Sequence, residues 1–458
     1  MATETEFDIL ILGGGSGGYA TALRAAQLGL KVGLIEKDKL GGTCLHRGCI
    51  PTKALLHAAE VADSARESEK FGVKATLDSI DIPGVNKYKD GIITKLHRGL
   101  QGLVKSRKVT MIEGEGKLVS EDTIEVDGTK YKGKNIVLAS GSYTRSLPGL
   151  EIEGKVIASE QALEMDTIPE KAIVLGGGVI GVEFASVWNS FGVDVTIIEG
   201  SKSLVPNEDP AIAKTLERQF RKRGIKFSTG VFFDSAEQTE NSVIAKLQNG
   251  KTFEGDVMLV AVGRGPVTEG LGYEEAGIKL DRGFVSTNDR LHTGVGNIYA
   301  VGDIVPGLQL AHRGFQQGIF VAEEIAGLKP ITIDETLIPK VTYCDPEISS
   351  VGLTEDQAKE KYGDDVKTVE YNLAGNGKSN ILNTTGFIKI VSKKDGPVLG
   401  VHMIGARMGE QVGEAQMIVS WEALPEEVAQ FIHAHPTQNE ALGEAFLVLA
   451  GKPLHAHN

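Results

Sequence analysis

Two cysteines five residues apart are the side chains best suited to chemistry in this chain. Cys44 and Cys49 lie in the segment GGTCLHRGCIPTK, and the 458-residue chain contains only three cysteines. A structural disulfide framework would need more cysteines, and a structural zinc site would need four ligands. Two inert buried cysteines are the remaining structural alternative. A thiol pair beside a bound cofactor can store two electrons as a disulfide, so the segment predicts a redox centre.

The five-residue spacing also predicts the local backbone. In a regular helix, residues five apart are separated by roughly 7.5 Å along the axis, whereas the Cα atoms of a disulfide are about 4.4–6.8 Å apart. The segment must therefore be irregular if the pair closes, and Gly48 allows this. Pro51 suits the first turn of the helix that follows. Cys49 would then lie at the positive end of that helix, where the dipole, and Lys53 if it turns back, favour the thiolate.

A repeated strand–helix–strand unit organises the first half of the chain. The sequence FDILILGGGSGGYATALRAAQLGLKVGLIEK resembles KAIVLGGGVIGVEFASVWNSFGVDVTIIEG. Each copy has an apolar strand, a G-x-G-x-x-G loop, a helix and a second strand that ends in glutamate, which is the dinucleotide-binding fingerprint in its context. The repeated residues are Gly13, Gly15, Gly18 and Glu36, and, each 163 residues later, Gly176, Gly178, Gly181 and Glu199. Two tight turns that bind no nucleotide are the structural alternative.

Two copies predict two dinucleotides. The glycines let a pyrophosphate approach the helix N-terminus, and the glutamate accepts hydrogen bonds from the adenosine ribose. The first copy leads into the cysteine segment, so its ligand should exchange electron pairs with the thiols. A flavin does this and nicotinamide ordinarily does not, which predicts FAD in the first copy and the nicotinamide cofactor in the second. Glu199 would repel a 2′-phosphate, and Gly181 also favours NAD over NADP.

Three later strands end in residues that suit cofactor binding. A strand predicted over residues 297–303 ends in Gly-Asp before a helix; Asp303 could cap that helix, but after two dinucleotide loops we assign it to the ribityl chain of FAD. The other two strands, which end at Ser142 and at Arg264, would be the closing strands of the first and the second dinucleotide-binding unit. The further cofactor-binding candidates are Lys37, Gly42, Thr43, Lys53, Gly116, Ser140, Gly141, Ser142, Glu183, Val231, Gly263, Arg264 and Ala311.

The segment HAHPTQNEALGEA supplies a candidate base. His433 and His435 lack a cysteine or carboxylate at a useful local spacing, so no metal site is predicted. A hydrogen-bonded core histidine is the structural alternative. Pro436 fixes the backbone after His435, and Glu440, at the start of a helix, is placed to orient an imidazole. Dithiol oxidation needs such a base, because a free thiol has a pKa of about 8.5 and an imidazole of about 6.5.

The composition excludes other classes of function. A net charge of −13 and a pI near 5.4 argue against a nucleic-acid partner. No apolar run approaches the roughly 18 residues of a membrane helix, so no membrane association is expected. The start MATETEFDILIL resembles neither a signal peptide nor a transit segment. We therefore expect a soluble cytoplasmic protein, or a mature organellar form.

With these residues in place, the chain resembles the pyridine nucleotide–disulfide oxidoreductases. The resemblance rests on GGTCLHRGCIPTK, both glycine fingerprints, the run Ala300–Asp303 and HAHPTQNE, and it spans Asp8 to Glu440. It implies an α/β fold with two Rossmann-like dinucleotide-binding domains, for FAD and NAD, and a C-terminal α+β dimerisation domain. The implied regions are residues 1–148 for FAD, 149–267 for NAD, 268–337 for a central domain that completes the FAD site, and 338–458 for the interface.

The resemblance also implies roles for individual residues. The protein would be a homodimer in which the interface domain of one subunit lends its histidine to the thiols of the other. Cys44 would meet the substrate, and Cys49 would lie beside the flavin. The other implied catalytic residues are Lys53 and Glu183, an ion pair near the flavin, His435, the base, and Glu440, which orients the base.

Three residues depart from the patterns of related enzymes. His46 and Arg47 stand between the cysteines where Asn-Val is common, and a cation there would either lower a thiol pKa or face solvent. Val179 stands where glutathione reductase has a gating tyrosine, which again differs from the NADPH-dependent enzymes.

The implied activity is flavin-dependent oxidation of protein-bound dihydrolipoamide with reduction of NAD. The substrate would be carried by the lipoyl domain of an acyltransferase in a 2-oxo acid dehydrogenase complex, or by the carrier protein of glycine cleavage. A glutathione-type reductase is the nearest alternative, and Glu199 and Gly181 argue against it. Mercuric reductase and large thioredoxin reductase would add C-terminal cysteines, which AGKPLHAHN lacks. A scaffold role within a multienzyme complex is compatible with the same dimer.

Overall fold

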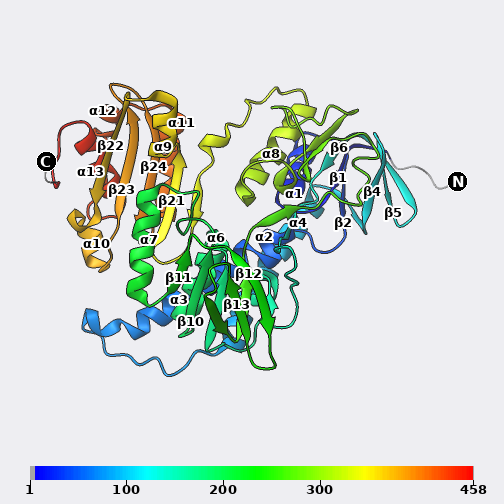
Figure 1. Ribbon diagram of the computed structural model, residues 1–458. Coiled ribbons are helices and arrows are strands. Elements are labelled where there is room, and N and C mark those ends of the chain that lie inside the picture. Colours follow the sequence, from blue (N-terminus) through cyan, green and yellow to red (C-terminus); the bar gives the residue numbers. More distant parts are fainter. Residues whose placement is uncertain (1–5, 457–458) are drawn as a thin grey trace.

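The computed structural model describes residues 6–456. It places a mostly parallel sheet at one end of the molecule, a C-terminal antiparallel sheet at the other, and a second parallel sheet between and below them (Figure 1). Each of these three sheets packs a hydrophobic core, and the core of the second sheet also includes side chains of the C-terminal sheet. This arrangement confirms the predicted fold class.

The first sheet forms because its central strands are apolar on both faces. β1 (Glu6–Leu12) and the second half of β6 (Thr129–Leu138) are almost fully buried, as is usual for a parallel sheet. The order is β3-β2-β1-β6-β5-β4, and β19 also pairs with β6. The other strands are β2 (Val32–Glu36), β3 (Thr110–Glu113), β4 (Gly116–Ser120), β5 (Thr123–Val126) and β19 (Ile298–Ala300).

Residues 268–337 return the chain to this first sheet. β19 pairs with β6 in parallel. α8 (Ala311–Ile325) packs along α1 (Ser16–Gln27) so closely that a Cβ on Gly318 would lie 2.5 Å from the carbonyl oxygen of Gly17. The core of the first sheet therefore includes side chains from both segments.

The strand predicted over residues 297–303 is shorter than expected. β19 ends at Ala300, and Asp303 lies in a 3₁₀ turn, η2 (Gly302–Ile304), because Gly302 turns the chain with a φ of 76°. The N-cap of α8 is Leu310. The capping alternative for Asp303 is therefore wrong, and its cofactor role stays a prediction.

The second parallel sheet repeats the plan of the first in the order β11-β10-β9-β15-β8. A three-stranded antiparallel sheet, β12-β13-β14, shares a core with it. The strands are β8 (Val156–Ile157), β9 (Lys171–Leu175), β10 (Asp194–Glu199), β11 (Lys226–Thr229), β12 (Phe233–Gln238), β13 (Val243–Leu247), β14 (Thr252–Gly255) and β15 (Val257–Val260). The helices are α5 (Ser159–Ala162), α6 (Val179–Ser190) and α7 (Pro210–Arg223).

Backbone geometry confirms the internal repeat. α1 and α6 each have 12 residues and begin at equivalent positions of the two copies. Gly13 and Gly176 have φ of 107° and 111°, a region that glycine alone enters freely. A Cβ at Gly13 would lie 2.2 Å from the carbonyl oxygen of Ala139, and one at Gly176 would lie 2.3 Å from that of Ala261. The two loops therefore require glycine for the same reason.

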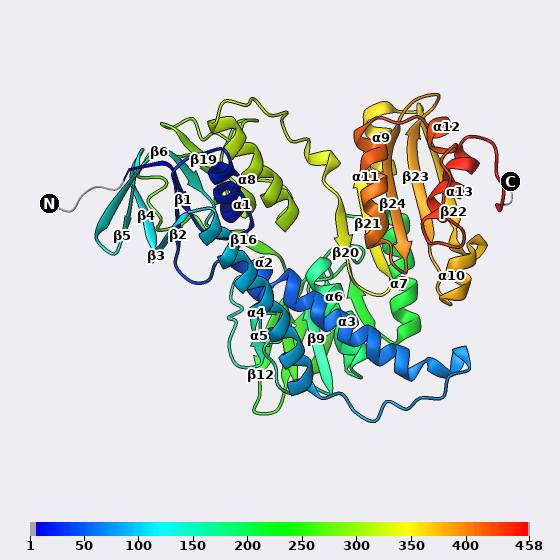
Figure 2. The same cartoon turned by 180° about the vertical axis from the view of Figure 1, so that it is seen from behind.

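Three helices connect the two parallel sheets. They are α2 (Gly42–Arg47), α3 (Cys49–Arg66) and α4 (Ile82–Ser106), and η1 (Ser68–Phe71) follows α3. α3 leaves the first sheet and runs beside α6, so that Leu55 belongs to the core of the second sheet (Figure 2). The start of α3, which carries Cys49, therefore lies where the two sheets meet.

The C-terminal sheet is antiparallel, in the order β20-β21-β24-β23-β22. Its strands are β20 (Lys340–Thr342), β21 (Glu347–Gly352), β22 (Val366–Asn372), β23 (Phe387–Lys393) and β24 (Val398–Gly405). Its helices are α9 (Glu355–Tyr362), α10 (Gly377–Ile381), α11 (Val412–Ser420), α12 (Pro425–Val428) and α13 (Glu440–Leu449). The remaining short elements are β7 (Ser142–Thr144), β16 (Arg264–Pro266), β17 (Leu280–Asp281), β18 (Phe284–Val285), η3 (Glu335–Leu337), η4 (Leu373–Gly375) and η5 (Gly409–Gln411). Of the helices described, none combines the length and apolar character needed to cross a bilayer.

Candidate functional site

The two predicted redox cysteines lie on either side of a helix break. α2 ends at Arg47, Gly48 has φ −145° and ψ −109°, and α3 begins at Cys49. The irregular segment predicted from the spacing is therefore confirmed. It brings the Cys44 thiol into hydrogen-bond contact with Cys49, and both cysteines are free and partly exposed.

The two thiols differ in their electrostatic surroundings. The hydrogen bond from Cys44 lowers the pKa of Cys49, and the positive charge of Lys53 adds to this against the effect of burial. The same hydrogen bond, together with burial, raises the pKa of Cys44 far above the usual value of about 8.5. Cys49 also opens α3, where the helix dipole favours an anion. Cys49 therefore becomes the thiolate while Cys44 keeps its proton.

An ion pair stands beside the thiols. The Lys53 ammonium lies 2.9 and 2.8 Å from the two carboxylate oxygens of Glu183, a residue of α6 that is only 3% exposed. Burial disfavours the charge of Lys53, but the attraction of Glu183 outweighs burial and raises the pKa of Lys53. The structure thus brings together the two residues expected as a pair, from two different helices, α3 and α6.

A cavity of about 200 Å³ opens beside the first glycine loop. The residues predicted to bind a cofactor that line it are Gly13, Gly15, Glu36, Lys37, Gly42, Thr43, Gly116, Ser140, Gly141 and Ser142. A Cβ on Gly42 would lie 2.7 Å from the Cα of Gly15, so the backbones form a cradle that a side chain would fill. Glu36 accepts hydrogen bonds from the N–H groups of Gly14 and Asp38, at 2.7 and 2.8 Å. A glycine cradle beside such a carboxylate fits the dinucleotide FAD.

Four other predicted positions lie outside the lining of this cavity. Gly18 packs under the loop, since a Cβ there would lie 1.8 Å from the carbonyl oxygen of Gly13. Asp303 accepts a hydrogen bond of 2.5 Å from the hydroxyl of Ser142 and so supports the cavity wall. Lys53 lies with the thiols, and Ala311 is the first residue of α8.

The cavity also has lining residues that the sequence did not indicate. These include Asp38, Arg47, Glu115, Val267 and Leu271. Asp38 follows Glu36 by two residues and Glu115 adjoins Gly116, so their closeness in sequence to predicted residues could have indicated that they line the cavity. Val267 and Leu271 lie after the second repeat, and no local pattern marks them.

The residues between the cysteines point away from the thiols. Arg47 donates to Asp38 at 2.6 Å and faces the cavity. The His46 Nε2 atom lies 2.9 Å from the Leu40 carbonyl oxygen, and its ring contacts the edge of His97 with centroids 4.9 Å apart. Neither residue is among the charges that shift the pKa of Cys44 or Cys49. The cation between the cysteines is therefore exposed and pairs with Asp38 instead of with a thiol.

The second glycine loop has the same internal contacts as the first. Glu199 accepts hydrogen bonds from the N–H groups of Gly177 and Ser201, both at 2.7 Å. Gly178 caps α6, and Gly181 packs under the loop with no room for a Cβ, which would lie 1.9 Å from the carbonyl oxygen of Gly176. The loop therefore presents backbone N–H groups and a carboxylate, as a dinucleotide needs.

The other residues predicted to bind the second dinucleotide lie at different places around the second parallel sheet. Gly263 has a φ of 117° between β15 and β16. Arg264 begins β16, which pairs with β7, and donates to the hydroxyl and carbonyl oxygens of Ser142 in that strand, both at 2.8 Å. Val231 is partly buried where the chain leaves β11, and Val179 at the start of α6 is 43% exposed. The start of α6 thus carries only a small side chain at this position.

The two C-terminal histidines have different surroundings. The His433 side chain is only 9% exposed and pairs with Glu414 at 2.9 Å, and this hydrogen bond raises the pKa of His433. The His435 side chain is 76% exposed, and its Nδ1 lies 3.0 Å from both oxygens of Glu440. The expected orienting contact is therefore present at His435, with the rest of its imidazole open. Among residues 6–456, no three potential metal ligands cluster.

His435 cannot reach the cysteines of its own chain. It precedes α13, which lies at the outer end of the C-terminal sheet, whereas α2 lies between the two parallel sheets (Figure 1 and Figure 2). A second subunit would have to supply the base to this thiol pair.

Comparison with known proteins gives two family matches and close relatives. Residues 7–318 match the model described as pyridine nucleotide-disulphide oxidoreductase, and residues 338–446 match its dimerisation domain. The chain is 43% identical to dihydrolipoyl dehydrogenase of Bacillus subtilis, covering 98% of this chain and 99% of the relative. It is 40% identical to mitochondrial dihydrolipoyl dehydrogenase of Pisum sativum, covering 98% and 93%. The crystal structure of LpdA from Mycobacterium tuberculosis superposes with a TM-score of 0.91 at 26% identity, covering 97% and 99%.

Proposed function

Because the chain belongs to the family of pyridine nucleotide-disulphide oxidoreductases, which use FAD and NAD(H), we propose that it oxidises protein-bound dihydrolipoamide and reduces NAD. The observation that carries the proposal is the unequal thiol pair, Cys44 and Cys49, beside a cavity that fits FAD. The substrate follows from the relatives, which match nearly the whole chain and are named dihydrolipoyl dehydrogenase. Those names do not favour a glutathione-type reductase.

The residues account for the electrons and protons of the reaction. In the oxidised enzyme Cys44 and Cys49 form a disulfide. His435 of the partner subunit takes a proton from one substrate thiol, whose sulfur attacks Cys44, and Cys49 leaves as the thiolate that its surroundings stabilise. The second substrate thiol then displaces Cys44, gives it a proton and closes the substrate disulfide. FAD, when bound, supplies the two-electron chemistry that passes the pair to NAD.

The dimerisation domain supports a homodimer, which this mechanism needs. Further parts of the proposal are a lipoyl domain of an acyltransferase, or a glycine-cleavage carrier protein, as the macromolecular substrate, and the cytoplasm as the location. The test of the function is NADH formation by the purified protein with free dihydrolipoamide and NAD. Efficient reduction of glutathione disulfide by NADPH, without dihydrolipoamide oxidation, would contradict it.

The purified protein should be yellow and contain one FAD per chain. The expectation rests on the cradle of Gly15 and Gly42 and on the Glu36 carboxylate beside the cavity. Denaturation followed by chromatography and an absorbance spectrum of the released nucleotide would measure the amount. A colourless, nucleotide-free protein with full activity would exclude the flavin from the mechanism.

Glu199→Ala should raise the KM for NAD by about 10- to 100-fold, because a charged hydrogen bond to the ribose contributes about 1.5–3 kcal/mol. The same change should narrow the preference for NAD over NADP, since the carboxylate no longer repels a 2′-phosphate. Steady-state kinetics with both cofactors measures kcat/KM. The matched variant Glu36→Ala should weaken FAD retention and leave the choice between NAD and NADP unchanged. Equal kcat/KM for NAD and NADP in the unmodified enzyme would refute the role of Glu199.

A further inference from the structure

The linker between β20 and β21 crosses from the dimerisation domain onto α6. The N–H of Tyr343 donates to a carboxylate oxygen of Glu183 at 2.9 Å, and the N–H of Asp345 donates to the hydroxyl of Ser186 at 3.2 Å. Glu183 and Ser186 are three residues apart, so they lie on the same face of α6. The linker is therefore bound along one turn of α6, the helix whose Glu183 pairs with Lys53 of α3.

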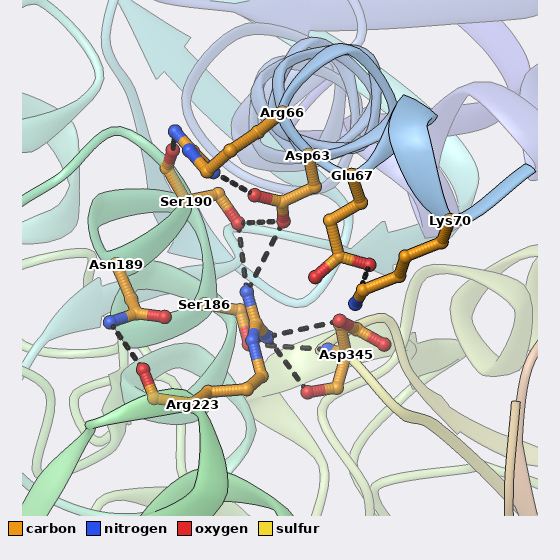
Figure 3. A network of polar contacts seen from close by, with 9 residues as sticks. All are labelled: Asp63, Arg66, Glu67, Lys70, Ser186, Asn189, Ser190, Arg223 and Asp345. Carbon is orange, nitrogen blue, oxygen red and sulfur yellow. Dashed lines mark hydrogen bonds and ion pairs between the residues drawn. The ribbon is translucent and has the colours of Figure 1, made fainter. Parts of the chain in front are cut away.

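Arg223, at the end of α7, fixes the other side of this linker. Its guanidinium donates to the carbonyl oxygen of Asp345 and to the hydroxyl of Ser190, both at 2.8 Å, and it reaches Asp63 of α3 at 3.4 Å (Figure 3). The guanidinium is 18% exposed. One arginine thus connects the cysteine-bearing helix α3, the helix α6 and the linker at Asp345, two residues after Tyr343.

Tyr343 contacts the ion pair in two ways. Besides its N–H bond to Glu183, its ring lies under the Lys53 ammonium, with Nζ 4.7 Å from the ring centroid. The ammonium is therefore held between a carboxylate and an aromatic face, and both attract a cation. Burial raises the pKa of Tyr343, so its hydroxyl stays neutral and only the ring face acts on Lys53.

We propose that Tyr343 is a positioning residue of the thiol site, whose ring and backbone N–H hold the Lys53 ammonium where its charge stabilises the Cys49 thiolate. The inference rests on the proposed function, in which Cys49 leaves as a thiolate. The energy between two charges falls with their separation, so a free Lys53 that moves toward solvent stabilises Cys49 less. The negative charge of Glu183 raises the pKa of Cys49 and the positive charge of Lys53 lowers it, so the net effect on this pKa depends on where the ammonium lies.

The test compares Tyr343→Leu with Tyr343→Phe in the Cys44→Ser holoenzyme. The readout is the pH midpoint of the long-wavelength absorbance that the Cys49 thiolate gives with the flavin. Tyr343→Leu should raise the pH midpoint by about half to one pH unit. At a pH below the midpoint, this shift makes the fraction of Cys49 present as thiolate about three- to tenfold smaller. Tyr343→Phe keeps the ring and should restore the midpoint of the parent. With Cys44 present, Tyr343→Leu should lower kcat more than it changes the KM for NAD.

A matched control removes a similar contact elsewhere. The ring of Tyr362, in α9 of the same domain, lies 4.5 Å from the Lys393 ammonium, and Tyr362→Leu should leave the midpoint unchanged. The groups that act on Cys49 remain in all variants; they are Cys44 or its serine, Lys53, Glu183 and Tyr19. Equal midpoints for Tyr343→Leu and Tyr343→Phe would overturn the proposal. Absence of dihydrolipoamide oxidation by the unmodified enzyme would instead refute the proposed function, because the thiolate titration does not depend on the substrate.

Discussion

Mixing two inactive variants, Cys44→Ser and His435→Gln, should restore dihydrolipoamide oxidation. Each variant alone should lose most of its activity, by about 10²- to 10⁴-fold for the base and to the background for the cysteine. In a heterodimer, intact Cys44 of one chain meets intact His435 of the other. Random exchange should therefore recover about a quarter of the unmodified activity, since half of the dimers are mixed and each has one complete site. The physical reason is the exposed imidazole, which is held by Glu440 and is remote from the thiols of its own chain.

The double variant Cys44→Ser/His435→Gln provides the control. Mixed with unmodified enzyme, it forms heterodimers in which the only intact thiol pair faces a glutamine. A shared site then leaves only the unmodified homodimers active, about a quarter of the total, whereas a site within one chain would leave about half. Native mass spectrometry would show that exchange occurred. No recovery in the first mixture despite proven exchange would exclude the shared site.

The nucleotide loops could be predicted from the sequence because their function restricts the backbone directly. Gly13 and Gly176 have positive φ, and a Cβ at either position would overlap a neighbouring carbonyl oxygen, so any other residue would be excluded at both positions. The repeated glutamates then follow at the end of the next strand, where each binds its own loop. Local sequence contained all of this information, and the structure agrees with it in both copies.

Features that depend on distant segments could not be predicted in the same way. The sequence placed residues 268–337 in a region of their own, but nothing in it showed that β19 would pair with β6 or that Gly318 would let α8 lie against α1. The contact of Tyr343 with Glu183 joins residues 160 positions apart and is made by a backbone N–H, which leaves no signature in residue type.

The two histidines show a further limit. His433 and His435 have similar neighbours in sequence, and a local carboxylate, Glu440, was visible for only one of them. The partner of His433 is Glu414, on another helix. Burial of His433 and exposure of His435 follow from how the segment lies on α11 and α13, which only the tertiary structure determines.

The serine variants of the two cysteines should differ in their absorbance spectra. Cys44→Ser should show a long-wavelength thiolate–flavin absorbance without any reductant, because Cys49 has lost its disulfide partner. The hydroxyl that replaces the Cys44 thiol can still donate a hydrogen bond to Cys49, and Lys53 and the start of α3 stabilise the thiolate further. Cys49→Ser should show no such band, since the remaining Cys44 has no comparable stabilisation. An absorbance spectrum of each oxidised protein makes the comparison. Both variants should lack turnover, so the spectrum, and not the rate, distinguishes them.

The pH dependence of the thiolate–flavin band shows whether the surroundings of Cys49 lower or raise its pKa. A lowered pKa means that Cys49 stays ionised at pH values where an ordinary thiol, with a pKa of about 8.5, is protonated. The band of Cys44→Ser should therefore persist as pH falls below 8.5 and disappear only when pH passes through the lowered pKa of Cys49. Lys53→Met should move that midpoint upward, because it removes the positive charge and leaves the Glu183 carboxylate near Cys49 without its cation. A thiolate–flavin band in Cys49→Ser would mean that the electrons pass through the sulfur of Cys44. A midpoint at or above 8.5 in Cys44→Ser would mean that the start of α3 does not stabilise the Cys49 thiolate.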